Sequence, residues 1–315
     1  MPADSSTPTT RRLACRLARR VSLAAAIVAV TWAAWAGGLA VSSRRATAVL
    51  TMQRQQNART IPDLKLDLVW IAPGQFRMGS PQRNWFLQWL DATRDTLGVK
   101  PNPGKGSEDD ERPVTWVTLT QPFWLGRTDV TQGQYEALMG ASPSYFKTAG
   151  RDAPVETVSW EDAMAFCRQL TGREQAAGRL PTGYVYTLPT EAQWEYACRA
   201  GTTDDYGGEI EALAWYDSNS GGTTHPVGLK QPNAWGLCDM HGNVWQWTRD
   251  WYGAYPGGAV TDPTGVATGE RRVFRGGCWA FPARVCRSAI RDYDPPGNQM
   301  FNVGFRLALV PSPAR

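Results

Sequence analysis

The stretch Asn233 to Trp247, NAWGLCDMHGNVWQW, combines residue types that can bind a hard cation. Its glycine, asparagine and aspartate residues favour turns, and its tryptophans must be covered, so the run fits neither a helix nor an alternating strand. We therefore expect a buried, irregular loop whose own amides and carbonyls need internal partners. A cation bound by oxygen atoms is one way to provide those partners, and Asp239 is the carboxylate of the stretch.

The composition restricts the chemistry available elsewhere in the 315-residue chain. Only two histidines, His225 and His241, leave little room for a histidine-rich metal centre. Residues 1–45 contain seven arginines, and the rest of the chain has 26 basic and 28 acidic residues, which gives no electrostatic basis for binding nucleic acid. Fifteen tryptophans and 31 glycines indicate a loop-rich domain that is packed by aromatic side chains.

An uncharged apolar run, Val21 to Val41, follows five arginines and is long enough to cross a bilayer as a helix. The positive-inside tendency places the basic residues 1–20 in the cytoplasm and the bulk of the chain outside the membrane. Segment 21–42 is either a retained signal anchor or a signal peptide that is removed after the small residues near Ala40. We expect an inner membrane of bacterial type, with the domain in the periplasm or outside, or secreted after cleavage.

A polar linker over residues 43–61 is expected to precede one domain over residues 62–315. Three capping boxes mark helix starts in this domain, because a hydroxyl residue is followed three positions later by an acceptor side chain. The boxes begin at Thr131, Ser159 and Thr190. The segment Asn84 to Gly98 suggests a short helix inside an insertion. Strands are expected in Leu66–Met78 as a hairpin turning at Pro73-Gly74, in Val114–Leu125, in Arg272–Phe274 and in Gly304–Val310.

Several motifs give the chain a resemblance to a known family. DMHGNVWQW, with TLPTEAQWEYACRAG upstream and RGGCW and NVGFR downstream, resembles the formylglycine-generating enzyme family, also called the sulfatase-modifying factor family. The motifs occur in the order typical of the family, and the resemblance covers Leu66 to Leu309. It implies an α+β domain with the formylglycine-generating-enzyme fold, which is related to C-type lectins and low in regular secondary structure.

The resemblance also implies a structural calcium site. In the family, side chains at the first and last positions of the motif and two main-chain oxygens between them bind the ion. The matching residues here are Asp239, Gly242, Val244 and Gln246. Such oxygen ligands suit a hard cation. Family members commonly have Glu in place of Gln246, so this site would lack one charge. A turn held by hydrogen bonds of Asp239 alone is the alternative.

Family enzymes that make formylglycine bind Cu(I) through two cysteine thiolates that follow the Gly-Gly of the RGG motif. The matching residues are Phe281 and Cys286, so the first thiolate is missing, and a short deletion before Arg287 puts the second in doubt. Copper is therefore not expected. The family's active-site serine is Cys278 here, which implies a centre that is rebuilt or lost. The catalytic candidates by resemblance are Cys278, Cys286, Trp245, Asn302 and Arg291.

A disulfide is implied by the same comparison. In family enzymes the cysteine that matches Cys198 pairs with one that matches Ser288. Cys286 lies two residues away and on the same face if the stretch is extended, so a bond between Cys198 and Cys286 is expected. An exported domain permits such a bond. Cys167 and Cys238 are then buried thiols.

Two other branches of the family bear on function. Hercynine-oxygenase-like members bind iron through histidines of a helical domain, and this chain has neither that domain nor enough histidines. A further group displays variable residues on the lectin-like scaffold, and the segment Cys278 to Phe305 resembles its C-terminal region. Its display positions would form a surface for a protein or peptide ligand, although an ordinary loop surface explains the same residues. These positions include Phe281, Tyr293, Met300 and Phe301.

The sequence thus leaves two functions open. The first is an exported, membrane-anchored family member that acts as a diverged oxidoreductase or accessory factor and does not itself make formylglycine. The second is a non-catalytic, C-type-lectin-like binding module with a variable C-terminal surface. Because one fold serves both roles, whether the chain is an enzyme depends on the geometry of the site.

Overall fold

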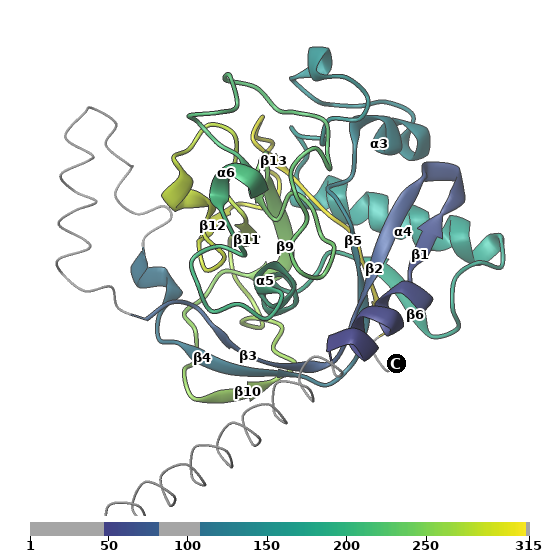
Figure 1. Ribbon diagram of the computed structural model, residues 1–315. Coiled ribbons are helices and arrows are strands. Elements are labelled where there is room, and N and C mark those ends of the chain that lie inside the picture. Colours follow the sequence, from purple (N-terminus) through teal and green to yellow (C-terminus); the bar gives the residue numbers. More distant parts are fainter. Residues whose placement is uncertain (1–46, 82–107, 313–315) are drawn as a thin grey trace, which may run out of the picture. The chain divides into compact units, whose positions relative to one another are not determined.

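Strands from both ends of the domain are neighbours in its largest sheet (Figure 1). The computed structural model describes residues 47–81 and 108–312. The chain divides into two units, residues 1–53 and 54–315, and residues 47–56 are helical. In the described ranges no helix is both long and apolar enough to cross a bilayer. The span predicted at 21–41 and the helix predicted at 84–98 lie outside those ranges.

The largest sheet has five strands, and each neighbouring pair is antiparallel. Leu68, Leu125 and Leu309 of its three central strands are buried, so the sheet forms one wall of the core. Its first strand falls within the range predicted as a linker, which therefore ends earlier than expected. In spatial order the strands are β1 (Arg59–Ile61), β2 (Leu66–Ile71), β5 (Phe123–Gly126), β14 (Ala308–Pro311) and β6 (Tyr184–Thr187).

Three smaller sheets complete the strand content. The first has the strand order β10 (Ala259–Thr261), β4 (Thr115–Leu119) and β3 (Gly74–Met78). The second has the order β12 (Arg291–Asp294), β11 (Arg272–Arg275), β9 (Trp245–Trp251) and β13 (Val303–Gly304). The third pairs β7 (Ala214–Trp215) with β8 (His241–Gly242).

Two strand predictions needed correction. The hairpin expected over 66–78 is wrong, because β2 pairs with β1 and β5 whereas β3 pairs with β4. The single strand expected over 114–125 is two strands, β4 and β5, which belong to different sheets. The break falls at Thr120 to Pro122, since proline lacks the amide that a ladder needs. The sequence located both extended stretches but not their partners.

All three predicted helix starts are confirmed. Thr131, Ser159 and Thr190 are N-caps, and each makes both hydrogen bonds of a capping box with the residue three positions on. Helices α3 and α4 pack together, and α4 also packs on β6. Besides the helical residues 47–56, the helices of the described ranges are α3 (Gln132–Met139), α4 (Trp160–Ala176), α5 (Glu191–Arg199) and α6 (Ile210–Leu213). The 3-10 turns are η1 (Pro62–Leu64), η3 (Glu108–Glu111), η4 (Lys147–Ala149) and η5 (Ala283–Cys286).

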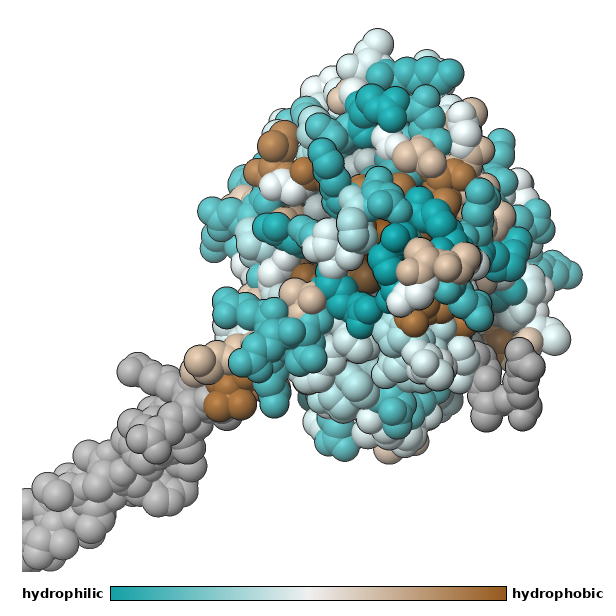
Figure 2. Space-filling model, turned by 90° about the vertical axis from the view of Figure 1, so that its right-hand side faces the viewer, coloured by the Kyte–Doolittle hydropathy of each residue, from teal (hydrophilic) through white to brown (hydrophobic). Residues whose placement is uncertain are grey.

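Aromatic side chains fill the interior, as the composition indicated. Trp194, Trp245 and Trp247 are among the largest fully buried side chains, and Trp247 Nε1 donates to the carbonyl of Val158 at 3.0 Å. The face of the protein in Figure 2 is mostly hydrophilic, with hydrophobic side chains in small separate groups. The mixed α+β class with little regular structure is therefore confirmed.

Candidate functional site

The RGG motif forms a sharp turn at the end of β11. Gly276 and Gly277 have φ angles of +101° and +75°, in a region that residues with a Cβ rarely adopt. A Cβ on Gly277 would lie only 2.6 Å from Cys286 Sγ, so glycine is needed for the close approach of the two segments. The turn thereby brings the backbone of Cys278 against the side chain of Cys286.

Burial raises the pKa values of both cysteines of this turn. Both are fully buried, and burial raises the pKa of the Cys278 thiol to about 12. Burial also raises the pKa of Cys286 far above its usual value, although the amides of Cys278 and Gly242 act against this shift. Since the thiolate is the nucleophile and the metal ligand, burial disfavours the reactive form of both residues.

Asn302 connects two other predicted catalytic residues. Its Nδ2 donates to Cys278 Sγ at 3.6 Å, and its carbonyl accepts the backbone N–H of Trp245 at 2.9 Å. The Trp245 ring lies edge-on to Phe281, with 6.4 Å between ring centroids. Cys278, Trp245, Asn302 and Phe281 thus meet at one place, where the residue that stands for the first family thiolate is a hydrocarbon ring.

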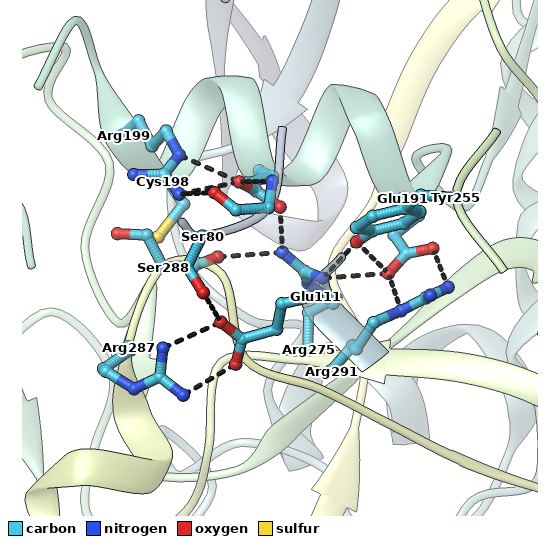
Figure 3. Close-up of polar contacts among 12 residues, drawn as sticks. Ser80, Glu111, Glu191, Cys198, Arg199, Tyr255, Arg275, Arg287, Ser288 and Arg291 are labelled. Carbon is cyan, nitrogen blue, oxygen red and sulfur yellow. Dashed lines mark hydrogen bonds and ion pairs between the residues drawn. The ribbon is translucent and has the colours of Figure 1, made fainter. Parts of the chain in front are cut away.

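Arg291 lies in a different environment. It is buried and donates through Nε and Nη2 to the two oxygens of Glu191, at 2.8 and 2.7 Å. Figure 3 shows Arg275 and Arg291 converging on Glu191, with Tyr255 beside them. We call the buried charges of this region the ion-pair network: Glu111, Glu191, Glu195, Arg199, Arg275, Arg287 and Arg291. The side chain of Arg291 thus bonds to Glu191 and to the carbonyls of Asp110 and Gly253, and its catalytic role stays a prediction.

The predicted Cys198–Cys286 disulfide is not formed. Both cysteines are free and buried, and Cys198 Sγ lies 3.7 Å from His241 Nε2 and 3.8 Å from the Met240 carbonyl oxygen. Ser288, which matches the family's partner cysteine, faces Cys198 (Figure 3), whereas Cys286 points toward Gly277. The prediction was wrong because residues 283–286 form a 3-10 turn, so positions 286 and 288 do not share one face.

An exposed group of aromatic rings surrounds the Cys278 site. Phe146 lies 5.2 Å from Trp279 and 5.0 Å from Tyr145, and Phe301 lies 6.0 Å from Trp279, all between centroids. The exposed fractions are 73% for Tyr145, 50% for Phe301 and 38% for Phe281. We call these four rings, together with Phe281, the aromatic surface: Tyr145, Phe146, Trp279, Phe281 and Phe301. Phe281 contacts Trp245 and not the other four rings, and we include it because it is exposed and follows Trp279 by two residues.

Three of its members, Tyr145, Phe146 and Trp279, were missed by the sequence reasoning. Tyr145 and Phe146 lie in the polar loop after α3, and adjacent aromatic residues in such a loop are a signal that could have marked them. Two predicted members lie elsewhere. Tyr293 stacks on Tyr252 at 3.7 Å between centroids, and Met300 packs against the buried core. Phe281 and Phe301 alone of the predicted display residues belong to the aromatic surface.

The predicted calcium loop is tight and buried. Gly242 has a φ of +73°, and a Cβ there would lie 2.1 Å from the Trp215 carbonyl oxygen. Asp239 is 2% exposed; its Oδ2 accepts the Gly228 amide at 2.8 Å, and its Oδ1 has no hydrogen-bond partner among the described residues. One carboxylate oxygen is thus available to a cation.

Gln246 does not fit the role of a calcium ligand in this arrangement. Its Oε1 already accepts hydrogen bonds from Trp194 Nε1 and Arg306 Nε, both at 2.7 Å. Its Nε2 donates to the Asp239 carbonyl at 2.6 Å, and Arg306 Nη2 donates to the same carbonyl at 3.1 Å. A cation would have to displace two donors, one of them positively charged, so the four-residue ligand set does not fit as it stands. Calcium binding by this loop stays a prediction.

Comparisons with known proteins agree with this architecture. Residues 53–310 match the family model described as the sulfatase-modifying factor enzyme 1-like domain. The formylglycine-generating enzyme of Mus musculus is 34% identical over 226 residues, which are 65% of this chain and 56% of that enzyme. The chaperone protein LppX of Paenibacillus barcinonensis is 30% identical over 187 residues, or 43% of this chain and 64% of LppX.

A solved structure is similar over nearly its whole length. Treponema denticola variable protein 1 superposes with a TM-score of 0.67 at 28% identity, covering 81% of this chain and 99% of that protein. By contrast, the match spans little more than half of the mouse enzyme, 56% of its length. The family model, the identities and the fold agree, and the chain belongs to the sulfatase-modifying factor family.

Proposed function

We propose that this protein is an accessory member of the family, which does not make formylglycine and instead holds a polypeptide segment against the aromatic surface. The observation that supports this most directly is the place of Phe281. It stands where the resemblance puts the first copper thiolate, packs edge-on to Trp245 and is 38% exposed. A ring at that position offers no ligand to a metal but adds apolar area to a binding surface.

The chemistry of the neighbouring cysteines supports the same proposal. Cys278 and Cys286 are fully buried thiols whose pKa values are raised by burial. Oxygen activation as the family performs it requires two thiolates on one Cu(I), and burial disfavours the thiolate form of both cysteines here. Both features support a site that does not perform that reaction, although Asn302 still contacts Cys278 and Trp245.

The aromatic surface has the properties of a peptide site. Rings with one face exposed present large apolar area at a low cost in conformational entropy, and aromatic residues are enriched where proteins bind one another. A shallow groove of about 430 Å³ runs beside Tyr145 and Phe301, with Lys147 and Gln299 as polar groups on its wall. The similarity to LppX, which is named a chaperone, also favours an accessory role.

The proposal is tested with a peptide that carries the sulfatase motif Cys-x-Pro-x-Arg. We expect mass spectrometry to find no loss of the thiol after incubation with protein, copper and oxygen, and titration to find saturable binding. Phe301→Ala should weaken that binding by about tenfold, the effect of losing ~1.4 kcal/mol. Leu229→Ala, an exposed apolar residue outside the aromatic surface, is the matched control. Aldehyde product, or equal binding by both variants, would overturn the proposal.

A second candidate is a diverged oxidoreductase that uses Cys278 with Cys286. The close approach at Gly277, which places the Cys286 side chain against the Cys278 backbone, favours this candidate. Binding of Cu(I) would require both thiols to lose their protons. A Cu(I) titration of reduced protein beside Cys278→Ser distinguishes the candidates, because one-to-one binding that vanishes in the variant would support the enzyme.

We also propose that the domain acts outside the cytoplasm. The apolar run 21–41 between two groups of arginines supports export, with the run as an anchor or a cleaved signal. Fractionation of cells and protease treatment of intact spheroplasts test this: the domain should be degraded from outside and should sediment with membranes if the run is retained.

A further inference from the structure

A small cavity lies away from the Cys278 site, between the β10-β4-β3 sheet and the start of α5. Its volume is about 180 Å³, and Val117, Val260 and Met78 supply apolar walls. Val266 lines it and is 41% exposed, which places the opening at the loop that follows β10. A cavity of roughly 150 Å³ in another protein admits benzene, so this one has room for a single ring with a short substituent.

Most polar groups at this cavity are already satisfied within the protein. Glu191 Oε1 accepts from Arg275, Arg291 and Tyr255, and its Oε2 accepts from Arg291. The remaining Arg291 donor, Nη1, serves the carbonyls of Asp110 and Gly253. The Tyr255 hydroxyl donates to Glu191 and accepts from Arg275. A ligand therefore gains little from these three side chains.

Asp250 is the exception on the cavity wall. It is 3% exposed, and its Oδ2 accepts the Glu191 amide at 2.9 Å at the first turn of α5. Its Oδ1 has no hydrogen-bond partner among the residues that the structure describes, and it faces Gly265, where an added Cβ would lie 3.2 Å away. One oxygen of this carboxylate thus borders the cavity, where solvent reaches it, and accepts no hydrogen bond from the described residues.

The neighbouring charges distinguish Asp250 from the other carboxylates of this region. Glu191 and Glu195 each accept hydrogen bonds from guanidinium groups, whereas Asp250 accepts none. Burial, followed by the charge of Glu191, raises the pKa of Asp250 to about 7, although the charges of Arg249 and Arg291 act against this shift. None of the described arginines nearby donates a hydrogen bond to Asp250, so a positively charged donor in the cavity would supply that bond and favour the ionised carboxylate.

We propose that this cavity binds a small primary amine with a ring-sized apolar body, and that the ammonium group hydrogen-bonds to Asp250 Oδ1. The apolar walls bind the body of the ligand, and Asp250 selects for the cation. The site is separate from the aromatic surface, so the proposal goes beyond the function proposed above and does not depend on it.

The test uses the full-length protein with benzylamine as the probe and benzyl alcohol as the neutral probe of similar size. We expect saturable binding of benzylamine by calorimetry, at least about tenfold tighter than that of benzyl alcohol. Asp250→Asn keeps the shape of the side chain and should remove that preference. Asp217→Asn, an exposed aspartate outside the cavity, should leave it unchanged.

A second variant keeps the test decisive if Asp250→Asn folds poorly. Val266→Trp adds bulk at the mouth of the cavity without touching an ion pair, and it should weaken both probes alike. A crystal soaked with benzylamine should show the amine within hydrogen-bond distance of Asp250. Equal affinity for benzylamine in wild type and Asp250→Asn, or no saturable binding at millimolar amine, would overturn the proposal.

Discussion

Two groups of buried charges in this protein differ in how their carboxylates are paired. In the ion-pair network, Glu111, Glu191 and Glu195 each accept hydrogen bonds from at least one guanidinium (Figure 3). In the second group, which we call the Arg306 cluster, Arg306 lies with Asp129 and Asp239. There Arg306 donates to Gln246 and to the carbonyls of Gly126, Cys238 and Asp239, while three carboxylate oxygens have no hydrogen-bond partner among the described residues.

This difference in pairing shows that burial alone does not determine whether a carboxylate is protonated. Burial by itself would raise the pKa of Glu195, but Arg199 and Arg275 hold it below its usual value. Burial raises the pKa of Asp129 far above its usual value and the like charge of Asp239 adds to the shift, although Arg306, 3.7 Å away, acts against it. The ion-pair network is therefore self-sufficient, whereas the Arg306 cluster favours a bound proton or cation.

The largest expected effect comes from breaking the self-sufficient group. Glu191→Ala leaves Arg275 and Arg291 buried without their shared partner, so we expect the free energy of unfolding to fall by about 3–5 kcal/mol. Urea unfolding followed by tryptophan fluorescence measures the loss. Glu136→Ala removes the exposed partner of Arg151 and should cost no more than about 1 kcal/mol. Equal losses in the two variants would contradict the role assigned to the network.

The second prediction concerns calcium at the Arg306 cluster. If an ion binds the unpartnered oxygen of Asp239 in the native state, a hundredfold excess over Kd should stabilise the protein by about 2.7 kcal/mol. A chelator should then lower the melting temperature of wild type and leave the melting temperature of Asp239→Ala unchanged. If neither calcium nor chelator changes the melting temperature, a proton or Arg306 alone balances the carboxylate charge of the cluster.

The third prediction is a pH dependence caused by Asp250. Its pKa is about 7 in the folded protein against an ordinary value of 3.8, so between these values the folded state binds more protons than the unfolded state. Stability contributed by this group is therefore full at low pH and declines as the pH rises, by about 1.4 kcal/mol per pH unit. The difference in unfolding free energy between wild type and Asp250→Asn should show that slope and level off above pH 7. A difference in unfolding free energy that does not change with pH would contradict the raised pKa of Asp250.

The sequence predicted the helix starts of this fold but not its strand pairing, for physical reasons. Capping boxes are local, because a hydroxyl and an acceptor three residues apart meet whenever the helix forms, and all three were correct. Strand partners depend on distant segments. Nothing in Leu66–Met78 shows that β2 joins β5 while β3 joins β4.

At the candidate site, too, the sequence predicted some of the contacts and not others. The motif resemblance located Cys278, Trp245 and Asn302 together, but it also grouped Arg291 with them. Arg291 instead pairs with Glu191, a hundred residues away in the chain. The proposed disulfide failed because a spacing of two residues implies a shared face only in extended backbone, and Cys286 ends a 3-10 turn.

The last and smallest expected effect on stability is that of Phe301→Ala. The side chain is 50% exposed and takes no part in an ion pair, so its removal should change the unfolding free energy by less than about 1 kcal/mol. Its ring nevertheless contacts Tyr145, Phe146 and Trp279, with centroids 6.0–6.3 Å apart. Peptide binding should therefore fall about tenfold while the urea midpoint stays near that of wild type. Glu191→Ala should show the opposite pattern, because Glu191 lies in the ion-pair network and outside the aromatic surface. Under conditions in which this variant is folded, its urea midpoint should fall while its peptide affinity stays near that of wild type. If Phe301→Ala instead destabilised the protein as much as Glu191→Ala, the ring would be part of the core and the proposed binding surface would lose its main support.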